Sequence, residues 1–366
     1  MSNRWQQLDA FGVSVWLDDL GRQRLVGGEL QRLVDQGVRG VTTNPTIFAK
    51  AIGDGSHYRD DLVSLARQGA TAEEAVRSLI VSDVVAACDV LAPVHRASGG
   101  VDGRVSIEVD PRLALDTDAT IAEARELWRT VDRSNVMIKV PATAEGLPAI
   151  TTLLGEGISV NVTLIFALQR YRDVLEAWLS GLEAAHDAGH DLSTIESVAS
   201  FFVSRFDTLV DPLLGEGHEE LHGKAALANA RLAYRDFTAT VSGDRWQRLA
   251  DAGAHVQRPL WASTSTKNPD YPDTIYVDGL VAPHTVNTMP AATLEAVLDH
   301  GAEPHDTVTG SYAEAEQTMT ALAEAGLDYD GLARTLEEQG VKSFSDSWEQ
   351  LLSAVGVALD VAAAAS

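Results

Sequence analysis

The chain has 366 residues, of which 45% are hydrophobic, so it contains enough apolar material for one large core or two smaller ones. Its 53 acidic residues outnumber its 28 basic ones, and a formal charge of −25 repels the phosphate backbone, which excludes nucleic acid as an expected partner. A single cysteine rules out an internal disulfide framework, and the lack of a signal-peptide core or of about 20 consecutive apolar residues predicts a cytoplasmic protein that does not enter a membrane.

Short runs rich in β-branched residues recur along the chain, and each is followed by a longer stretch with helical spacing. The expected strands are Val13–Leu17, Gly40–Thr43, Val105–Val109, Val136–Val140, Ser159–Ile165, Val198–Val203, Pro259–Ala262 and Thr285–Thr288. Their near-continuous hydrophobicity is typical of parallel strands covered on both faces, with helices in the crossovers. Eight such units predict an α/β fold, a closed (β/α)8 barrel of the TIM type. An open doubly wound sheet is disfavoured, because no Gly-rich phosphate turn follows the first strand.

Three segments carry more helix than a minimal barrel needs, at about residues 1–12, 207–257 and 311–366. We interpret them as extra helices on a single domain that spans residues 1–366, since no linker, low-complexity block or solenoid repeat divides the chain. We expect the Ala-rich end, from Leu351 to Ser366, to pack on the chain's own barrel. An amphipathic helix that binds a partner is the alternative.

In a parallel barrel the reactive groups gather at the C-terminal ends of the strands. Lys139 lies there inside a hydrophobic run, where a buried charge requires compensation. A lysine amine with its ordinary pKa of about 10.4 is neutral only about 0.1% of the time at neutral pH. Burial increases the neutral fraction, and this is how a lysine becomes a Schiff-base nucleophile. A structural ion pair with Glu108 or Asp18 is the other interpretation.

Five segments in consistent order resemble the signatures of transaldolases, in particular the longer bacterial and plant branch. They are GVTTNPTIF (40–48), VSIEVDPR (105–112), IKVPAT (138–143), GISVNVTLIF (157–166) and TVNTMP (285–290). The similarity spans roughly residues 13–290, and five strings in one register are far more specific than a single motif.

The resemblance implies roles for four catalytic side chains. Lys139 corresponds to the lysine that attacks the ketose carbonyl and forms the imine. Glu108 corresponds to the acid that shuttles protons through a water held by Thr163. Asp18 resembles the aspartate that takes the proton from the C4 hydroxyl as the carbon–carbon bond breaks. Asp19 is the alternative base, although the phase of the strand favours Asp18.

The resemblance also implies a set of substrate-binding residues. Asn44 and Asn161 match amides that hold sugar hydroxyls and the trapped intermediate, and Ser200 matches a further hydroxyl contact. Arg205 matches a phosphate-binding arginine. Better-known relatives carry a second arginine near the seventh strand, where we expect Lys267 to supply the charge as a point cation rather than a two-pronged fork.

The function implied is transfer of a dihydroxyacetone unit between sugar phosphates in the non-oxidative pentose phosphate pathway. The donor would be sedoheptulose 7-phosphate or fructose 6-phosphate, and the acceptor glyceraldehyde 3-phosphate or erythrose 4-phosphate. No cofactor is expected, because the protonated imine is itself the electron sink. Two alternatives remain: a Schiff-base aldolase that releases free dihydroxyacetone, and a non-catalytic barrel that binds a metabolite. A monomer or a homodimer is expected.

The string His218-Glu219-Glu220-Leu221-His222 matches the H-E-x-x-H pattern of zinc proteases. Its flanks are polar and contain glycines, whereas a zinc helix is normally held in a core, so we predict no metal site. Cys88 lies in an apolar helical stretch and is expected to be a buried structural thiol.

Overall fold

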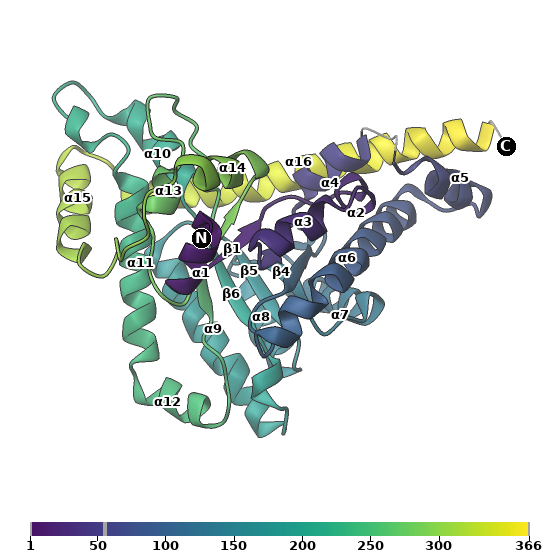
Figure 1. Ribbon diagram of the computed structural model, residues 1–366, viewed down its shortest axis with the longest axis horizontal. Coiled ribbons are helices and arrows are strands. Elements are labelled where there is room, and N and C mark those ends of the chain that lie inside the picture. The colour runs from purple at the N-terminus through teal and green to yellow at the C-terminus, as the bar shows by residue number, and fades with distance from the viewer. Residues whose placement is uncertain (1, 54–56, 365–366) are drawn as a thin grey trace.

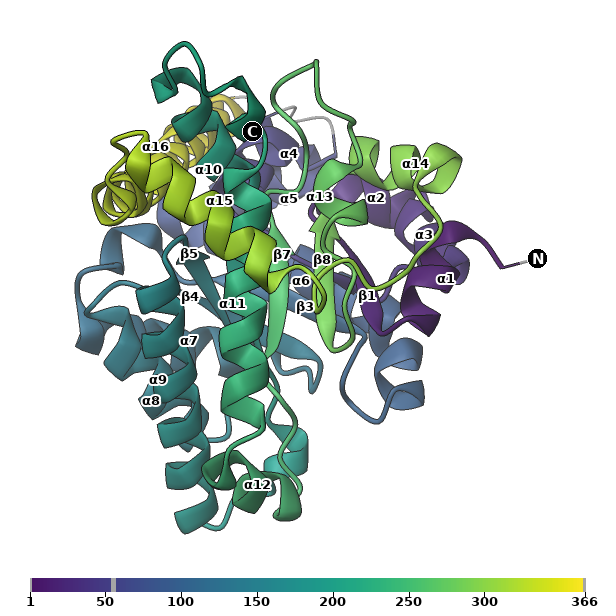
Figure 2. The same cartoon turned by 90° about the vertical axis from the view of Figure 1, so that its left-hand side faces the viewer.

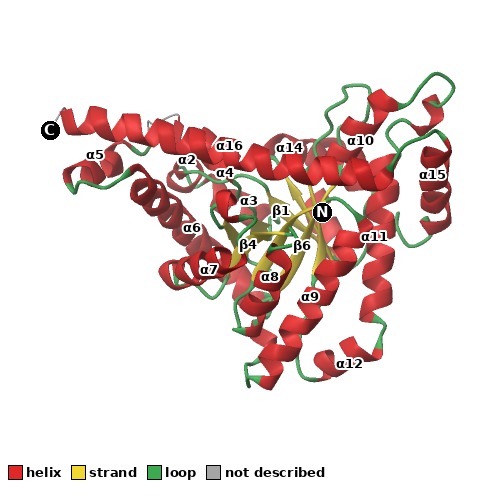
Figure 3. Cartoon of the chain, turned by 180° about the vertical axis from the view of Figure 1, so that it is seen from behind, coloured by secondary structure: helices red, strands yellow, loops and turns green. Residues whose placement is uncertain are grey.

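The computed structural model describes residues 2–53 and 57–364. Eight parallel strands pair in chain order, and the eighth pairs with the first to close the barrel. They are β1 (Val13–Leu17), β2 (Gly40–Val41), β3 (Arg104–Glu108), β4 (Val136–Pro141), β5 (Val160–Ile165), β6 (Ser197–Phe202), β7 (Arg258–Ala262) and β8 (Thr285–Met289). The predicted (β/α)8 barrel is confirmed, and Figure 3 shows its strands ringed by helices.

Helices cover the outside of the barrel (Figure 1). The α-helices are α1 (Arg4–Ala10), α2 (Arg22–Val26), α3 (Glu29–Gln36), α4 (Pro45–Gly53), α5 (Arg59–Arg67), α6 (Ala72–Ala97), α7 (Thr117–Val131), α8 (Gly146–Gly155), α9 (Leu168–Asp187), α10 (Ser204–Val210), α11 (Ala225–Val241), α12 (Asp244–Asp251), α13 (Ile275–Asp278), α14 (Ala291–His300), α15 (Tyr312–Glu324) and α16 (Tyr329–Ala364). Short 3-10 turns are η1 (Pro111–Leu113), η2 (Leu192–Thr194), η3 (Asp211–Leu213) and η4 (Glu219–Leu221).

The strands lie close to their expected places, with two informative differences. β2 ends at Val41 rather than at Thr43, because the chain turns there into α4. β5 carries a register shift between Val162 and Ile165, and Leu164 adopts a positive φ of 60°. Such a conformation is uncommon for a leucine, and bulges of this kind re-aim side chains at the rim of a barrel.

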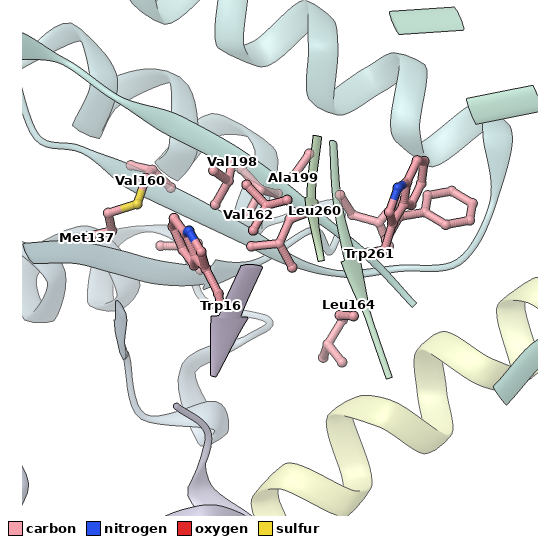
Figure 4. Packing of buried hydrophobic residues seen from close by; sticks show 14 of the residues in the cluster. Trp16, Met137, Val160, Val162, Leu164, Val198, Ala199, Leu260 and Trp261 are labelled. Atoms are coloured by element: carbon pink, nitrogen blue, oxygen red, sulfur yellow. The ribbon is translucent and has the colours of Figure 1, made fainter. Parts of the chain in front are cut away.

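The strand register places charged and polar side chains in one layer of the lumen. Glu108 of β3 pairs with Lys139 of β4, and Lys139 pairs with Asn161 of β5. Deeper in the barrel, Trp16 fills the interior (Figure 4). A side chain at Gly40 would meet the indole at 2.4 Å, so only glycine fits beside this tryptophan.

The segments expected to carry extra helix contain α1, α10 to α12, and α15 with α16. The tract expected at 207–257 is not one continuous helical stretch, because Pro212, Gly215, Gly217 and Gly223 interrupt it between α10 and α11. Beyond this break, α11 lies beside α15 (Figure 2).

The C-terminal helix α16 crosses the molecule and continues along α4, α5 and α6 (Figures 1 and 3). Its last turns bury Leu351, Val355 and Leu359, so the end of the helix packs on the same chain, as expected. Residues 365 and 366 of the expected terminal segment lie outside the described residues. None of the helices that the structure describes combines the length and the apolar character needed to cross a lipid bilayer.

Candidate active site

A cavity of about 140 Å³ opens at the C-terminal ends of the strands. Six of the predicted site residues line it, namely Asp18, Asn44, Lys139, Ser200, Arg205 and Lys267. Further walls are Thr42, Phe202, Ala262, Ser263, Ser265, Thr288, Pro290 and Phe344. The other three predicted residues, Glu108, Asn161 and Thr163, are buried in the strands around it. The structure therefore brings residues from distant parts of the sequence to one end of the barrel.

Lys139 and Glu108 form a buried ion pair. Lys139 Nζ lies 3.3 Å from Glu108 Oε2, and each side chain is only 4% exposed. The ammonium also donates a hydrogen bond of 3.0 Å to the carbonyl oxygen of Thr43. Neither oxygen of Glu108 accepts a well-aligned hydrogen bond from the described part of the chain. The carboxylate is thus held beside the amine but retains free acceptor capacity.

The environment of Glu108 favours its protonated form. Desolvation raises the pKa of Glu108 to about 7, against the opposing effect of Lys139, and the charge of Asp18 raises it further. A carboxyl group with a pKa near neutrality can both donate and accept a proton at physiological pH. Glu108 therefore has the acid–base character that proton shuttling requires.

Asp18 and Asp19 are adjacent in sequence but face different surroundings. Asp18 accepts a hydrogen bond of 2.7 Å from Thr42 Oγ1 and lines the cavity with Lys139. Desolvation raises the pKa of Asp18, although Lys139 and the Thr42 hydroxyl oppose the shift. Asp19 instead pairs with Arg24 at 2.7 Å and lines a separate pocket. The strand phase that favoured Asp18 thus agrees with the geometry.

Amide and hydroxyl side chains form a polar wall. Asn161 Nδ2 donates to Ser106 Oγ at 2.9 Å, and Ser200 Oγ donates to Asn161 Oδ1 at 2.7 Å. Asn44 Oδ1 accepts from the backbone N–H of Ile47 at 3.0 Å, which fixes the side chain at the start of α4. These bonds hold both amides in defined orientations.

Thr163 differs from the other hydroxyls of the site. It is fully buried, and its hydroxyl makes no hydrogen bond within the described residues. It comes directly before Leu164, where β5 departs from regular geometry. A buried hydroxyl left without a partner marks a place where bound water is favourable.

The far side of the cavity is cationic. Arg205 stacks over the Phe202 ring at 5.3 Å from its centroid, and Lys267 Nζ donates to Ser265 Oγ at 2.6 Å. Neither cation has a carboxylate within 4.0 Å among the described residues. Burial lowers the pKa of Arg205, but a guanidinium remains charged at neutral pH. Two unpaired cations at one end of a cavity are suited to bind a phosphate.

Sequence reasoning missed several lining residues. Thr288 lies at the end of β8, where its hydroxyl is 2.6 Å from Thr42 Oγ1, and a fuller inspection of the strand ends would have found it. Phe344 comes from α16, with its ring centroid 5.6 Å from Lys139 Nζ. No strand-end rule points to Phe344, because its place depends on how α16 packs.

The H-E-x-x-H string does not form a zinc helix. Glu219–Leu221 is a short 3-10 turn that excludes both histidines, and His222 is exposed. Within residues 2–53 and 57–364, no group of three or more His, Cys, Asp or Glu side chains is arranged to hold a metal ion. Cys88 is buried in α6, and desolvation raises the pKa of its thiol to about 12, which agrees with a structural thiol.

Comparison with known proteins identifies the family. The family model described as "Transaldolase/Fructose-6-phosphate aldolase" matches residues 15–355. A "Transaldolase" of Acidothermus cellulolyticus is 57% identical over 98% of this chain and 98% of the relative, and one of Thermobifida fusca is 58% identical over 97% and 98%. A "Transaldolase" of Mycobacterium tuberculosis is 55% identical over 97% of each chain. The chain therefore belongs to the transaldolase/fructose-6-phosphate aldolase family.

Proposed function

We propose that this chain is a transaldolase, a transferase in which Lys139 forms a Schiff base with a ketose phosphate in the cavity at the C-terminal end of the barrel. Family membership and full-length relatives named "Transaldolase" support the activity. The observation that carries the assignment of Lys139 is its burial 3.3 Å from Glu108 in a cavity with two unpaired cations. A lysine held in this way is the nucleophile that imine chemistry requires.

Imine formation would use the Lys139–Glu108 pair. The neutral amine attacks C2 of the ketose, and Glu108 delivers the proton with which the carbinolamine hydroxyl leaves as water. A water bound between Glu108 and Thr163 would relay this proton, since both side chains have buried oxygen atoms without hydrogen-bond partners. The product is a protonated imine that draws electrons from the neighbouring carbon–carbon bond.

Cleavage would use Asp18. Its carboxylate takes the proton from the C4 hydroxyl, the bond between C3 and C4 breaks, and the bonding pair moves into the imine to give an enamine. The departing aldose phosphate is replaced by an acceptor aldose, whose carbonyl carbon bonds to C3 of the enamine as Asp18 returns the proton. Hydrolysis of the new imine then frees Lys139 and the product ketose.

The cationic side of the cavity would set the substrate class. Arg205 and Lys267 would hold the terminal phosphate. Asn44 and Asn161 would hold sugar hydroxyls and the intermediate on Lys139, and Ser200 would contact a further hydroxyl. Sedoheptulose 7-phosphate and fructose 6-phosphate fit as donors, and glyceraldehyde 3-phosphate and erythrose 4-phosphate as acceptors. The net negative charge does not oppose this, because attraction at the site depends on local cations.

The full set of chemical groups disfavours a non-catalytic barrel, because a mere binding site has no need for a buried lysine beside an acid with a raised pKa. We further propose a cytoplasmic location, supported by the single, buried cysteine. A monomer or homodimer remains the prediction for the oligomeric state, which light scattering would measure.

A transfer assay tests the proposed function. The purified protein should move the dihydroxyacetone unit from fructose 6-phosphate to erythrose 4-phosphate, and it should do so after exhaustive chelation. Lys139→Ala should reduce this rate to background, whereas Lys342→Ala, which removes a lysine that is 73% exposed, should leave it unchanged. Persistence of transfer in Lys139→Ala, or its loss on chelation with recovery on addition of zinc, would contradict the proposal.

A further inference from the structure

Two aromatic side chains line the cavity, one beside the proposed nucleophile and one beside a proposed phosphate-binding cation. Phe202 of β6 stacks on the cation Arg205, whereas Phe344 of α16 faces Lys139, with 5.6 Å between the ring centroid and Nζ. Phe344 is 3% exposed and lines the same cavity as Lys139. The C-terminal helix thus supplies a wall at the nitrogen that would become the imine.

Several contacts fix the first half of α16. At its start, Tyr329 donates a hydrogen bond of 2.7 Å to Asn229 and accepts one of 2.8 Å from the backbone of Leu168. One turn before Phe344, a side chain added at Gly340 would lie 3.0 Å from Leu164 Cδ2. Figure 4 shows Leu164 directed at the ribbon of α16. The helix therefore sits directly on the irregular end of β5, where a larger residue at Gly340 would press on Leu164.

The residues after Phe344 fix the helix on the other side. The hydroxyl of Ser347 hydrogen-bonds that of Thr46 at 2.9 Å, which ties α16 to the helix that begins just after Asn44. Trp348 lines a small cavity of about 20 Å³ together with Ile107 and Glu108. The turn containing Phe344 thus lies between residues that contact the ends of β3 and β5, and these contacts hold its backbone in place.

Transfer has a competing reaction at the site. After cleavage the enamine on Lys139 must wait for the acceptor. If a water carries to C3 the proton that Asp18 took from the C4 hydroxyl, the resulting imine adds water at C2, its bond to nitrogen breaks, and dihydroxyacetone leaves while the amine is restored. The water consumed here balances the one released when the imine formed, so the net reaction is cleavage of the donor into an aldose phosphate and dihydroxyacetone, which is the reaction of an aldolase. Both reactions end with hydrolysis of an imine, so they diverge where C3 takes a proton. Water must therefore be kept from the enamine until the acceptor has bonded to it.

We propose that Phe344 is a positioning residue that shields the enamine on Lys139 from water while it waits for the acceptor, so that α16 favours transfer of the dihydroxyacetone unit over its release. The inference rests on the proposed function and deepens it. An aromatic ring offers an ordered water no strong hydrogen-bonding partner, and its face attracts a cationic nitrogen. A ring at this position disfavours an ordered water beside the enamine, and it faces the nitrogen when the imine is cationic.

The test measures free dihydroxyacetone formed from fructose 6-phosphate relative to the unit transferred to erythrose 4-phosphate. Phe344→Ala should raise this ratio about tenfold, and Phe344→Leu about threefold because it restores part of the apolar wall; tenfold corresponds to about 1.4 kcal/mol between the two barriers. Leu351→Ala is the matched control, since Leu351 is 1% exposed on the same helix but does not line the cavity. Its ratio should equal that of the unmodified protein.

An unchanged ratio in Phe344→Ala would overturn the inference, as would an equal rise in Leu351→Ala, which would indicate a general loosening of the helix. If Phe344→Ala does not fold, Phe344→Leu decides, and an unchanged ratio there counts against the shield. Failure of the proposed function would look different, because the unmodified protein would then neither transfer the unit nor be labelled on Lys139 by donor and borohydride.

Discussion

Each end of the barrel holds a buried carboxylate, and the two differ in how many hydrogen bonds they accept. Asp102, near the N-terminal ends of the strands, and Glu108, at the C-terminal end, are both 9% exposed as whole residues, with side chains 12% and 4% exposed. Asp102 accepts hydrogen bonds from Ser14 at 2.8 Å, from Trp16 at 3.3 Å and from Arg258 at 3.1 Å. Among the described residues, Glu108 has the ammonium of Lys139 at 3.3 Å as its ionic partner and accepts no well-aligned hydrogen bond.

This difference in hydrogen bonding distinguishes a buried carboxylate with a structural role from one with a chemical role. A buried carboxylate whose lone pairs are satisfied holds its neighbours in place. A buried charge that is left partly unsatisfied acquires a shifted pKa and can exchange protons with a substrate. The exposed fraction of a carboxylate therefore does not indicate its role, whereas the hydrogen bonds that it accepts do.

The largest effect of a substitution is expected at the N-terminal end of the barrel, where the hydrogen bonds of Asp102 are satisfied. Asp102→Ala leaves the Arg258 guanidinium buried without its carboxylate, and breaking such a pair costs about 3–5 kcal/mol. Urea denaturation should show this loss in the free energy of unfolding, while the fraction that remains folded keeps the transfer rate of the unmodified protein. A loss of unfolding free energy below about 1 kcal/mol would mean that Asp102 does not have the structural role that distinguishes it from Glu108.

At the reactive end, Asp18→Ala should lower turnover by about 10²-fold or more, as expected for removal of a general base. Imine formation does not need this carboxylate, so borohydride should still trap the intact ketose phosphate on Lys139. Asp19→Ala should have a milder effect, because Asp19 pairs with Arg24 away from the cavity. If Asp19→Ala trapped the uncleaved sugar and Asp18→Ala turned over normally, the two carboxylates would have to exchange roles.

Glu108 should reveal itself in the pH dependence of stability. Its pKa rises from an ordinary 4.5 to about 7 on folding, so the folded state binds more protons between these values. Stability from this group is therefore fully present below pH 4.5 and is lost as the pH rises through 7. Glu108→Gln removes this dependence, so its stability relative to the unmodified protein should increase between pH 5 and pH 8, by at most about 3 kcal/mol. Parallel unfolding curves at all pH values would argue against a raised pKa.

The smallest effect is expected at the phosphate-binding side. Arg205→Ala should raise KM for phosphorylated substrates about tenfold, and Lys267→Ala should raise it less because Lys267 is exposed. Unphosphorylated sugars should show almost no change in either variant. Equal losses on both kinds of substrate would mean that the two cations do not bind the phosphate.

The sequence was most informative where periodicity and strand phase suffice. Strand phase favoured Asp18 over Asp19, and inspection of the strands drew attention to Glu108, Lys139 and Asn161, whose roles were taken from the family resemblance. These predictions need only the local backbone geometry, which short hydrophobic runs specify well.

Features that depend on tertiary packing were not predictable in this way. The bulge at Leu164 arises where α16 presses on the end of β5, and Phe344 reaches the site only because that helix crosses the barrel. Nor does the sequence show that Lys267 is held by Ser265, since loop conformation rather than periodicity sets that contact.

Covalent trapping on Lys139 tests the central claim most directly. Incubation with fructose 6-phosphate and borohydride should add a dihydroxyacetone-derived mass to the peptide that contains Lys139, and the Lys139→Ala protein should take up none. Because Lys139 is the lysine that lies beside the buried acid Glu108, it should be the single labelled site in the cavity. Label on Lys50 or Lys267 instead, with Lys139 unmodified, would contradict the account.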